Sequence, residues 1–360
     1  MTVLSLNSRQ YLELEKIALG AFAPLSGFMN EEEFLSVVET MRLPGGELFP
    51  LPVLLDLTPT QTNEIRNAGR VALVFDDREV GELEAEGLFQ CDKIEISRKV
   101  FGTSDDAHPG VSHFLRMGDV FVGGAVRLHE RVQFEFSEFE LTPSETKALF
   151  KSKGLRTIAG FQTRNVPHRA HEYLQRLALE HCYGLFIQPL VGAKKVGDYQ
   201  PAAILAAYRA LIEGFLPQER VLLGILSTAM RYAGPREALF HAIIRRNYGC
   251  THFVIGRDHA GVGSYYEKYE AHELSRRFEG ELGIEILRFY GPFHCRNCGG
   301  IVTERSCPHM DTDPAAITEV NGSDIRAILG TGANIRADLV RPEVAESLRG
   351  LPLFIESDAE

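Results

Sequence analysis

The chain has 360 residues, of which 44% are hydrophobic and 24% are charged, and this composition is typical of a folded globular protein with two or three domains. The formal net charge of −11 argues against a general nucleic-acid binder, because the neutralisation of phosphates requires a basic surface. No apolar run approaches the roughly 18 residues of a membrane span, and residues 1–20 lack the basic and apolar blocks of a secretory signal. We therefore expect a cytoplasmic protein.

Residues 1–150 are predicted to form a β-rich domain with short helices. Turn-forming prolines and glycines recur in this part, and the runs 51–57, 70–75 and 119–127 have the composition of strands. No group of side chains here has the pattern of a catalytic site. We expect this domain to pack against the rest of the chain or to flank a substrate.

Regular alternation of strand-like and helix-like segments begins near residue 151. The apolar runs are 155–161, 185–191, 221–226, 252–255 and 284–289, and the helical segments between them are 168–181, 202–215, 235–248 and 264–278. This alternation predicts an α/β domain over 151–309 with a doubly wound, mostly parallel, Rossmann-like sheet. A small C-terminal domain is expected over 310–360.

Polar segments follow the first four apolar runs, at 162–172, 192–198, 227–237 and 256–261. The carboxyl ends of parallel strands share one edge of the sheet, and ligands of such sheets bind beyond that edge. Each of these segments supplies cations or histidines. The sequence therefore predicts an anion-binding active site there.

His168 and His171 are one turn apart at the start of a predicted helix, where backbone N–H groups and the helix dipole favour an anion. Imidazoles in that position can donate hydrogen bonds to a phosphate and respond to the charge on a leaving group. Arg164 on the preceding loop offers a bidentate fork that suits a tetrahedral oxyanion. The alternatives for the histidines are structural surface residues, or a metal site with Glu172.

Further cations are candidate contacts for a polyphosphate. Arg231 on the third polar segment, and Lys194 and Lys195 on the second, could neutralise phosphate charge, or could equally serve as structural or solvated side chains. In the fourth segment, glycines flank Arg257, Asp258 and His259, and glycine allows peptide N–H groups to approach a ligand closely.

Three of the six cysteines cluster near the end of the α/β region, in the pattern Cys295-x2-Cys298-x8-Cys307-x-His309. A Cys-x2-Cys pair followed by glycines is typical of a tetrahedral Zn²⁺ site, and Cys307 and His309 complete four ligands. Four protein ligands leave no open position, so such a metal is structural. His294 is an alternative fourth ligand, and free buried thiols or iron–sulfur ligation are the other interpretations.

Together these segments carry a resemblance. Residues 162–172 contain Gln-Thr-Arg-Asn followed by Pro-His-Arg-Ala-His-Glu, which resembles the signature of the ATP sulfurylase (sulfate adenylyltransferase) family. Residues 256–261 resemble its second signature, and residues 231–237 match the loop between them. Residues 20–29 are similar to a motif of the family's N-terminal domain, which has a PUA-like β fold. The cysteine cluster resembles that of its single-function, zinc-bearing prokaryotic members.

The resemblance implies residue roles. It implies ATP binding by Gln162, Thr163, Arg164, Asn165, Gly256, Arg257, Asp258 and His259. It implies catalytic roles for Thr163, Arg164, Asn165, His168 and His171, and sulfate binding by Arg164 and Ala260. Val166 departs from the proline found in many members, which should alter loop stiffness more than chemistry. A fused adenylylsulfate-kinase domain is not expected, because its phosphate loop is absent from the sequence.

The implied reaction joins sulfate to the α-phosphate of ATP by direct in-line attack and releases diphosphate. The resemblance also implies Mg²⁺ bound with ATP, a structural Zn²⁺ and a homo-oligomer. The sequence leaves the physiological direction open among sulfate assimilation, dissimilatory reduction and ATP formation during sulfur oxidation. Two rival functions are a nucleotidyltransferase with a phosphorylated organic acceptor and an RNA-binding protein, and the acidic charge weighs against the second.

Overall fold

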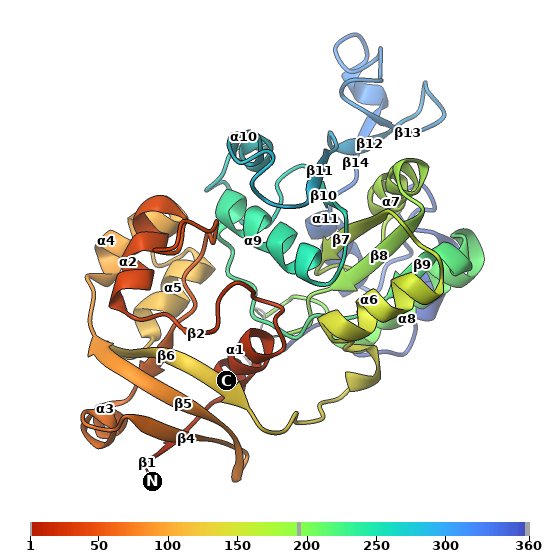
Figure 1. The fold of residues 1–360 in the computed structure, drawn as a ribbon. Helices are drawn as coiled ribbons and strands as arrows, with labels where there is room; N and C mark the ends of the chain where they lie inside the picture. The colour runs from red at the N-terminus through yellow and green to blue at the C-terminus, as the bar shows by residue number, and fades with distance from the viewer. Residues whose placement is uncertain (1, 193–195, 357–360) are drawn as a thin grey trace.

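The structure is a computed structural model that describes residues 2–192 and 196–356. Figure 1 shows a β-rich N-terminal part beside an α/β part, with a small β-sheet projecting from the α/β part. The predicted fold class, a β-rich domain followed by a parallel α/β sheet, is confirmed. None of the helices in the described ranges is long and apolar enough to cross a membrane.

The N-terminal part is a six-stranded sheet in the order β1-β4-β5-β6-β2, with β3 also paired to β6. Only the β1–β4 pair is parallel. The strands are β1 (Thr2–Ser5), β2 (Gly27–Phe28), β3 (Leu55–Leu57), β4 (Arg70–Phe75), β5 (Arg78–Phe89) and β6 (Val120–Leu128). The helices are α1 (Ser8–Ala18), α2 (Glu31–Thr40), α3 (Pro59–Ile65), α4 (Lys93–Phe101) and α5 (Pro109–Arg116).

Local chemistry explains where these elements begin. Helices α1, α2 and α3 each start with a capping box, in which the side chains of the N-cap and of the third helical residue bond each other's backbone N–H groups. Strand β5 was not predicted from the sequence, because its many glutamates obscure the apolar alternation. Asp76 and Asp77, both in the left-handed region with φ of 52° and 59°, make the tight turn that pairs β5 with β4.

The α/β part is built on a parallel five-stranded sheet in the order β11-β10-β7-β8-β9. The strands are β7 (Ile158–Thr163), β8 (Gly184–Pro189), β9 (Val221–Leu223), β10 (His252–Ile255) and β11 (Glu285–Arg288). The helices are α6 (Pro143–Ser152), α7 (Arg169–His181), α8 (Pro201–Phe215), α9 (Gly234–Asn247) and α10 (Glu270–Arg277), with short 3₁₀ helices η1 (Ser137–Phe139) and η2 (Gln218–Arg220). All five predicted strands are confirmed, but α10 begins six residues after the predicted start at 264.

The strand order of this sheet reverses between β7 and β10. From β7 the chain runs outward through β8 and β9, and it then returns to the other side of β7 to add β10 and β11. Loops that leave the carboxyl ends of two strands at such a switch point diverge and leave a crevice between them. The two loops concerned follow Thr163 and Ile255, and they carry the two signature segments.

The C-terminal segment forms a three-stranded antiparallel sheet and two helices. Its elements are β12 (Pro292–Cys295), β13 (Gly300–Thr303), η3 (Pro314–Ala316), β14 (Ile317–Glu319), α11 (Gly322–Gly330) and α12 (Pro342–Ser347). Buried residues from Val320 to Leu348 share one hydrophobic core with α7 and α8, because the apolar faces of α11 and α12 are too small to form a core of their own. The small C-terminal domain expected over 310–360 stays a prediction.

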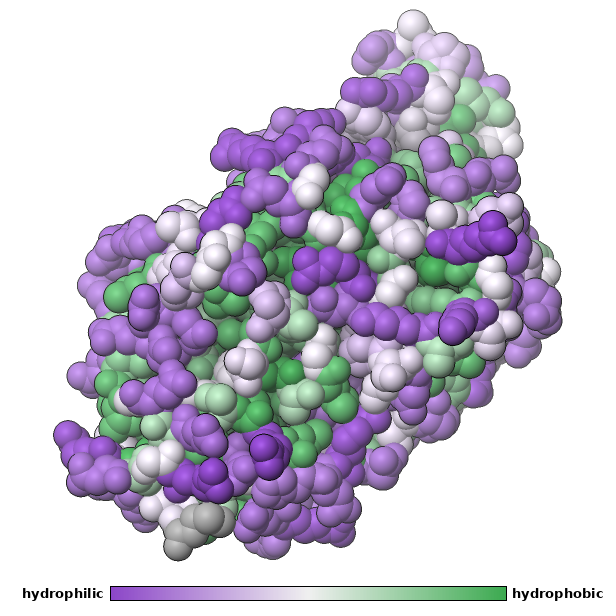
Figure 2. Space-filling model, in the orientation of Figure 1, coloured by the Kyte–Doolittle hydropathy of each residue, from purple (hydrophilic) through white to green (hydrophobic). Residues whose placement is uncertain are grey.

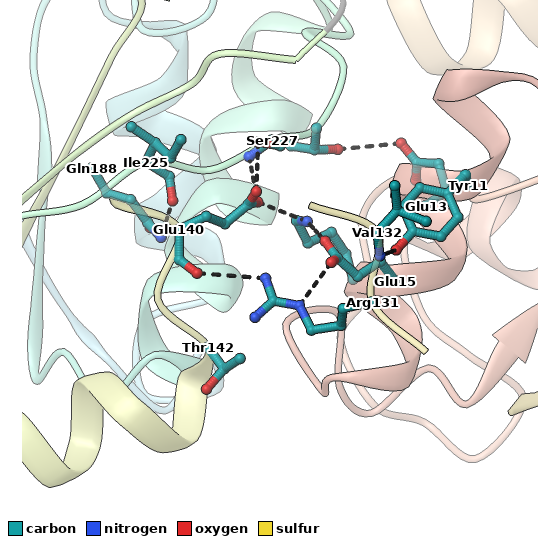
Figure 3. Close-up of polar contacts among 12 residues, drawn as sticks. Tyr11, Glu13, Glu15, Arg131, Val132, Glu140, Thr142, Gln188, Ile225 and Ser227 are labelled. Atoms are coloured by element: carbon teal, nitrogen blue, oxygen red, sulfur yellow. Dashed lines mark hydrogen bonds and ion pairs between the residues drawn. The ribbon is translucent and has the colours of Figure 1, made fainter. Parts of the chain in front are cut away.

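A buried polar network joins helix α1 to the α/β part (Figure 3). The Lys16 ammonium lies between the carboxylates of Glu15 and Glu140, at 2.8 Å from Glu140 Oε1. The backbone N–H and hydroxyl of Ser227 donate to Glu140 at 3.0 and 2.8 Å, and Arg131 Nε lies 2.8 Å from Glu15 Oε1. The segment that follows Ser227 is therefore anchored to the N-terminal part.

On the face in Figure 2, hydrophilic residues predominate along the outline, and apolar residues gather nearer the centre.

Candidate active site

The loop after β7 is shaped by its own side chains. Thr163 Oγ1 accepts a hydrogen bond from the backbone N–H of Asn165 at 3.0 Å, which turns the chain sharply at the end of the strand. Val166 is fully buried, so an apolar side chain is sufficient at this position. His168 is then the N-cap of α7, because its Nδ1 accepts from the backbone N–H of His171 at 3.2 Å. The loop and the N-terminus of α7 thus form one unit.

The loop after β10 is held in an unusual backbone conformation. Asp258 and Ala260 have φ values of 52° and 58°, in the left-handed region that non-glycine residues adopt infrequently. A side chain on Gly261 would place its Cβ 1.9 Å from Asp258 Oδ1, so the Asp258 side chain would have to move to accommodate it. The Ala260 carbonyl accepts from the backbone N–H of Gly234 at 3.2 Å, and this bond ties the loop to the start of α9. Such strain is characteristic of ligand-binding loops.

The two loops line a single cavity of about 260 Å³. Of the residues predicted for the site, the cavity is lined by Gln162, Thr163, Arg164, Asn165, His168, His171, Gly256, Arg257, Asp258, His259 and Ala260. Segments almost a hundred residues apart in the sequence are therefore brought together. The structure establishes their common position, and the roles assigned to the individual residues stay predictions.

Arg164 has no carboxylate partner among the described residues. Its guanidinium carbon lies 4.9 Å from the centre of the Tyr232 ring, and its Nη2 donates a long hydrogen bond of 3.5 Å to the Gly261 carbonyl. Its Nη1 is buried and has no hydrogen-bond partner in the described parts of the chain. A buried donor without a partner is costly, so this guanidinium is suited to receive an anion.

The imidazoles of His168 and His171 are stacked with ring centres 3.8 Å apart. Burial lowers the pKa of His168 well below its usual value, and the neighbouring His171 and Arg257 lower it further. Burial also lowers the pKa of His171 to about 4. Both rings are therefore neutral at pH 7 in the free protein, and Nδ1 of His171 is buried without a partner in the described chain. An anion nearby would favour protonation of either ring.

The C-terminal segment contributes residues to the cavity that sequence reasoning missed. They are Val320, Asn321, Gly322, Ser323 and Arg326, at the start of α11. Arg326 Nη1 donates to Asn165 Oδ1 and lies 3.7 Å from Asp198 Oδ1. Residues 323–326 carried only a helix signal, because no local pattern indicates which distant loop a helix will meet. Arg326, the fifth residue of this helix, was the available hint.

Arg231 was predicted at the nucleotide site, and the structure places it elsewhere. Its side chain is buried beside helix α1, with Nη2 at 2.6 Å from Glu13 Oε2, and its guanidinium carbon lies 4.8 Å from the centre of the Phe240 ring. It is not among the residues that line the cavity. A buried arginine with a carboxylate partner is already neutralised, so it joins the two parts of the molecule instead. Lys194 and Lys195 lie outside the described residues.

The four residues of the cysteine cluster come together at the tip of the projecting sheet. One ligand atom from each of Cys295, Cys298, Cys307 and His309 lies within 4.8 Å of all the others. Cys298 Sγ is 3.8 Å from Cys307 Sγ and 3.2 Å from His309 Nδ1. Three sulfurs and one imidazole nitrogen at these separations can hold a tetrahedral metal ion. His294, the alternative fourth ligand, instead has its Nδ1 3.6 Å from Asp338 Oδ2.

Comparisons with known proteins agree with the fold. The family model for ATP-sulfurylase matches residues 137–350, and that for a PUA-like domain matches residues 1–131. The sulfate adenylyltransferase of Chloroflexus aurantiacus is 45% identical over 97% of this chain and 91% of its own length. That of Deinococcus radiodurans is 45% identical over 96% of this chain and 88% of its own length.

One solved structure has a similar fold. It is titled hexameric APS kinase from Thiobacillus denitrificans, and it superposes with a TM-score of 0.73 at 22% identity over 97% of this chain. This chain spans 62% of that solved chain, and the likeness concerns the fold alone. The family match over more than half of the sequence, and 45% identity to full-length relatives, show that the chain belongs to the ATP-sulfurylase family.

Proposed function

We propose that the chain is a sulfate adenylyltransferase, which transfers the adenylyl group of ATP to sulfate. A sulfate oxygen attacks the α-phosphorus in line, the bond from that phosphorus to the bridging oxygen of diphosphate breaks, and adenylyl sulfate and diphosphate are formed. The observation that carries this proposal is the buried Arg164 Nη1, which has no hydrogen-bond partner in the described chain and lies in the same cavity as the stacked histidines at the start of α7. The reverse reaction uses the same groups.

The chemical obstacle is the approach of one anion to another. Arg164 and the backbone N–H of Ala260 are proposed to hold sulfate, because the unpartnered Nη1 and the weakly bonded Nη2 of Arg164 offer donors beside a strained loop. Orientation of sulfate against the α-phosphorus then supplies much of the rate enhancement. No covalent enzyme intermediate is needed.

The phosphates of ATP are proposed to lie against the N-terminus of α7. There His168, His171 and the backbone N–H groups can take up the charge that develops as diphosphate leaves. Arg257, whose Nη1 is 2.6 Å from the half-exposed Glu319, can exchange that partner for a phosphate. The remaining loop residues are proposed to contact the nucleotide, namely Gln162, Thr163, Asn165, Gly256, Asp258 and His259. Arg326 is added to this set because it bonds Asn165.

Two metal ions belong to this proposal. Mg²⁺ would enter with the β- and γ-phosphates of ATP, because Asp258 is the one carboxylate among the described residues that line the cavity. Zn²⁺ would be held by Cys295, Cys298, Cys307 and His309, and it would brace the projecting sheet without taking part in the reaction.

The wider organisation follows the same reasoning. Residues 1–150 are proposed as a PUA-like supporting domain, 151–309 as the catalytic domain and 310–360 as a C-terminal region that completes the cavity. We also propose a cytoplasmic location and a homo-oligomeric state. The solution mass of the purified protein tests the latter.

The function is tested by the exchange of labelled diphosphate into ATP in the presence and absence of sulfate. Arg164→Ala should abolish the sulfate-dependent exchange, and Arg164→Lys should restore little, because a point charge lacks the bidentate fork. Arg156→Ala is the matched control, since this exposed arginine precedes the same strand outside the cavity. Exchange that ignores sulfate, or normal turnover in Arg164→Ala, would defeat the proposal.

A further inference from the structure

Behind the β10 loop, a carboxylate and two imidazoles form a chain that reaches the cavity. Glu237 and His241 lie one turn apart on α9 and are both almost fully buried. Glu237 Oε1 is 3.4 Å from His241 Nε2. His241 Nδ1 is in turn 3.3 Å from Nε2 of His259, whose ring lines the cavity. The mechanism described above uses neither Glu237 nor His241.

The proton positions along this chain can be derived from its buried end. The two oxygens of Glu237 accept the backbone N–H groups of Arg231 and Ala233, at 2.9 and 3.0 Å. Burial opposes ionisation of Glu237, but the contact with His241 and the backbone donors bring its pKa below the usual value, so it is a carboxylate and can only accept. His241 Nε2 must therefore carry a hydrogen.

Both imidazoles in the chain are neutral and carry one ring hydrogen each. Burial lowers the pKa of His241 and, more strongly, that of His259, and nearby cations including Arg245 act in the same direction. With its hydrogen on Nε2, His241 offers Nδ1 as an acceptor. His259 must then place its own hydrogen on Nε2, which leaves its Nδ1 as an acceptor.

We infer that His241 is a positioning residue that fixes the tautomer of His259, so that His259 presents a hydrogen-bond acceptor to the bound nucleotide. This rests on the proposed function. Among the groups of ATP and sulfate, only the adenine amino group and the ribose hydroxyls can donate a hydrogen bond, because the phosphates and sulfate are acceptors. His259 therefore recognises the nucleoside half of ATP and does not contribute to diphosphate binding.

Three substitutions at position 241 separate this role from simple packing. His241→Gln keeps a donor near Glu237 but no longer offers an acceptor at the Nδ1 position. His241→Asn keeps an acceptor there but loses contact with Glu237. His241→Leu removes both groups at similar volume. If His241 serves only Glu237, the glutamine variant is the mild one; if it orients His259, the asparagine variant is the mild one.

The first measurement needs no substrate. Nitrogen-15 spectra of histidine-labelled protein should show His259 as the Nε2–H tautomer in the wild-type protein and in His241→Asn, and a mixture of tautomers in His241→Gln and His241→Leu. The second measurement is equilibrium binding. The Gln and Leu variants should bind ATP about fivefold to tenfold more weakly, the usual effect of one hydrogen bond, while binding of inorganic diphosphate is unchanged.

The outcomes distinguish this inference from the proposed function. A wild-type His259 with its hydrogen on Nδ1 would overturn the tautomer assignment, and equal loss of ATP and diphosphate affinity in the variants would overturn the recognition of the nucleoside half. In both cases sulfate-dependent exchange would persist. The opposite result, the expected tautomer in a protein without sulfate-dependent exchange, would refute the proposed function and leave the hydrogen-bond chain intact.

Discussion

The buried ion network between α1 and the α/β part offers a quantitative test of what holds the two parts together. Lys16 and Glu15 are each 1% exposed and Glu140 is 5% exposed, so their charges are shielded from water. Lys16→Met removes the cation at similar length and leaves two buried carboxylates. After this change, Glu15 still has Arg131 at 2.8 Å, and Glu140 still accepts two hydrogen bonds from Ser227.

Removal of one partner from a buried ion pair costs about 3–5 kcal/mol, and because both orphaned carboxylates keep some partners we expect the lower value, about 3 kcal/mol in the free energy of unfolding. The matched control is Lys99→Met. Like Lys16, Lys99 contacts two glutamates, but it does so at the surface. Its Nζ lies 2.6 Å from Oε1 of Glu39 and 2.6 Å from Oε1 of Glu95. Its loss should cost no more than about 1 kcal/mol. The double variant Lys16→Met/Glu140→Gln should recover about half of the lost stability, because it also removes the orphaned charge.

The sign of the pH dependence is a second check. In the wild-type protein, burial opposes ionisation of Glu140, but Lys16 and Ser227 hold its pKa below the usual value. The contribution of the ionised Glu140 to the free energy of unfolding is therefore present above its unfolded pKa of about 4.5, and this contribution is lost as the pH falls below that value. Without Lys16, burial dominates and raises that pKa, so protonation relieves the orphaned charge. The difference in stability between wild type and Lys16→Met should therefore narrow from about pH 8 to about pH 5.

The assay is urea unfolding followed by far-ultraviolet circular dichroism and by tyrosine fluorescence, since the chain contains no tryptophan. Coincident transitions would show that the two parts unfold together and would justify a single free energy. The reasoning is refuted if Lys16→Met loses no more stability than Lys99→Met, or if the difference from wild type is independent of pH.

Two further predictions concern the site and the cysteine cluster. His171→Ala should lower turnover by roughly 10²–10³-fold, the effect of losing one preorganised donor; and because burial lowers the pKa of His171 to about 4, the wild-type kcat/KM profile should show no inflection from this residue between about pH 6 and pH 8. Purified protein should contain about one zinc ion per chain, which Cys298→Ser should lose together with thermal stability while Cys91→Ser, outside the cluster, retains it. Undiminished turnover in the first case, or zinc retained by Cys298→Ser in the second, would contradict these assignments.

Much of the α/β part was predictable because its signals are local. Each buried parallel strand lies in an apolar run, most helices begin at a polar or proline residue, and the polar segments follow the strand ends by the rule for such sheets. The topology then required the loops after Thr163 and Ile255 to meet, whatever the details of packing. The metal cluster was equally local, since its ligands span Cys295 to His309.

The features that sequence reasoning missed depend on contacts between distant segments. The meeting of Arg326 with Asn165 arises because α11 packs in the same core as α7 and α8, and no periodicity in residues 320–330 indicates that partner. The expected position of Arg231 at the nucleotide site differs from the structure for the complementary reason. Its position after a strand suggested the cavity, but Glu13, more than two hundred residues earlier, holds it against helix α1.

Whether a buried arginine binds a ligand or supports the fold can be judged from two observations together. Arg231 has a carboxylate at 2.6 Å and no cavity, and it is structural. Arg245 has no carboxylate partner within residues 2–192 and 196–356, and its Nη2 donates to the Gln188 carbonyl at 2.8 Å. Burial lowers its pKa to about 10, yet it is not among the residues that line the cavity. Among the arginines that the structure describes, only Arg164 combines an unsatisfied buried donor with a place on the cavity wall. A lone buried cation can thus be tolerated within the fold. It becomes a candidate for anion binding only where space exists for the anion. The assignment of sulfate to Arg164 therefore depends on the cavity as much as on the charge of the guanidinium.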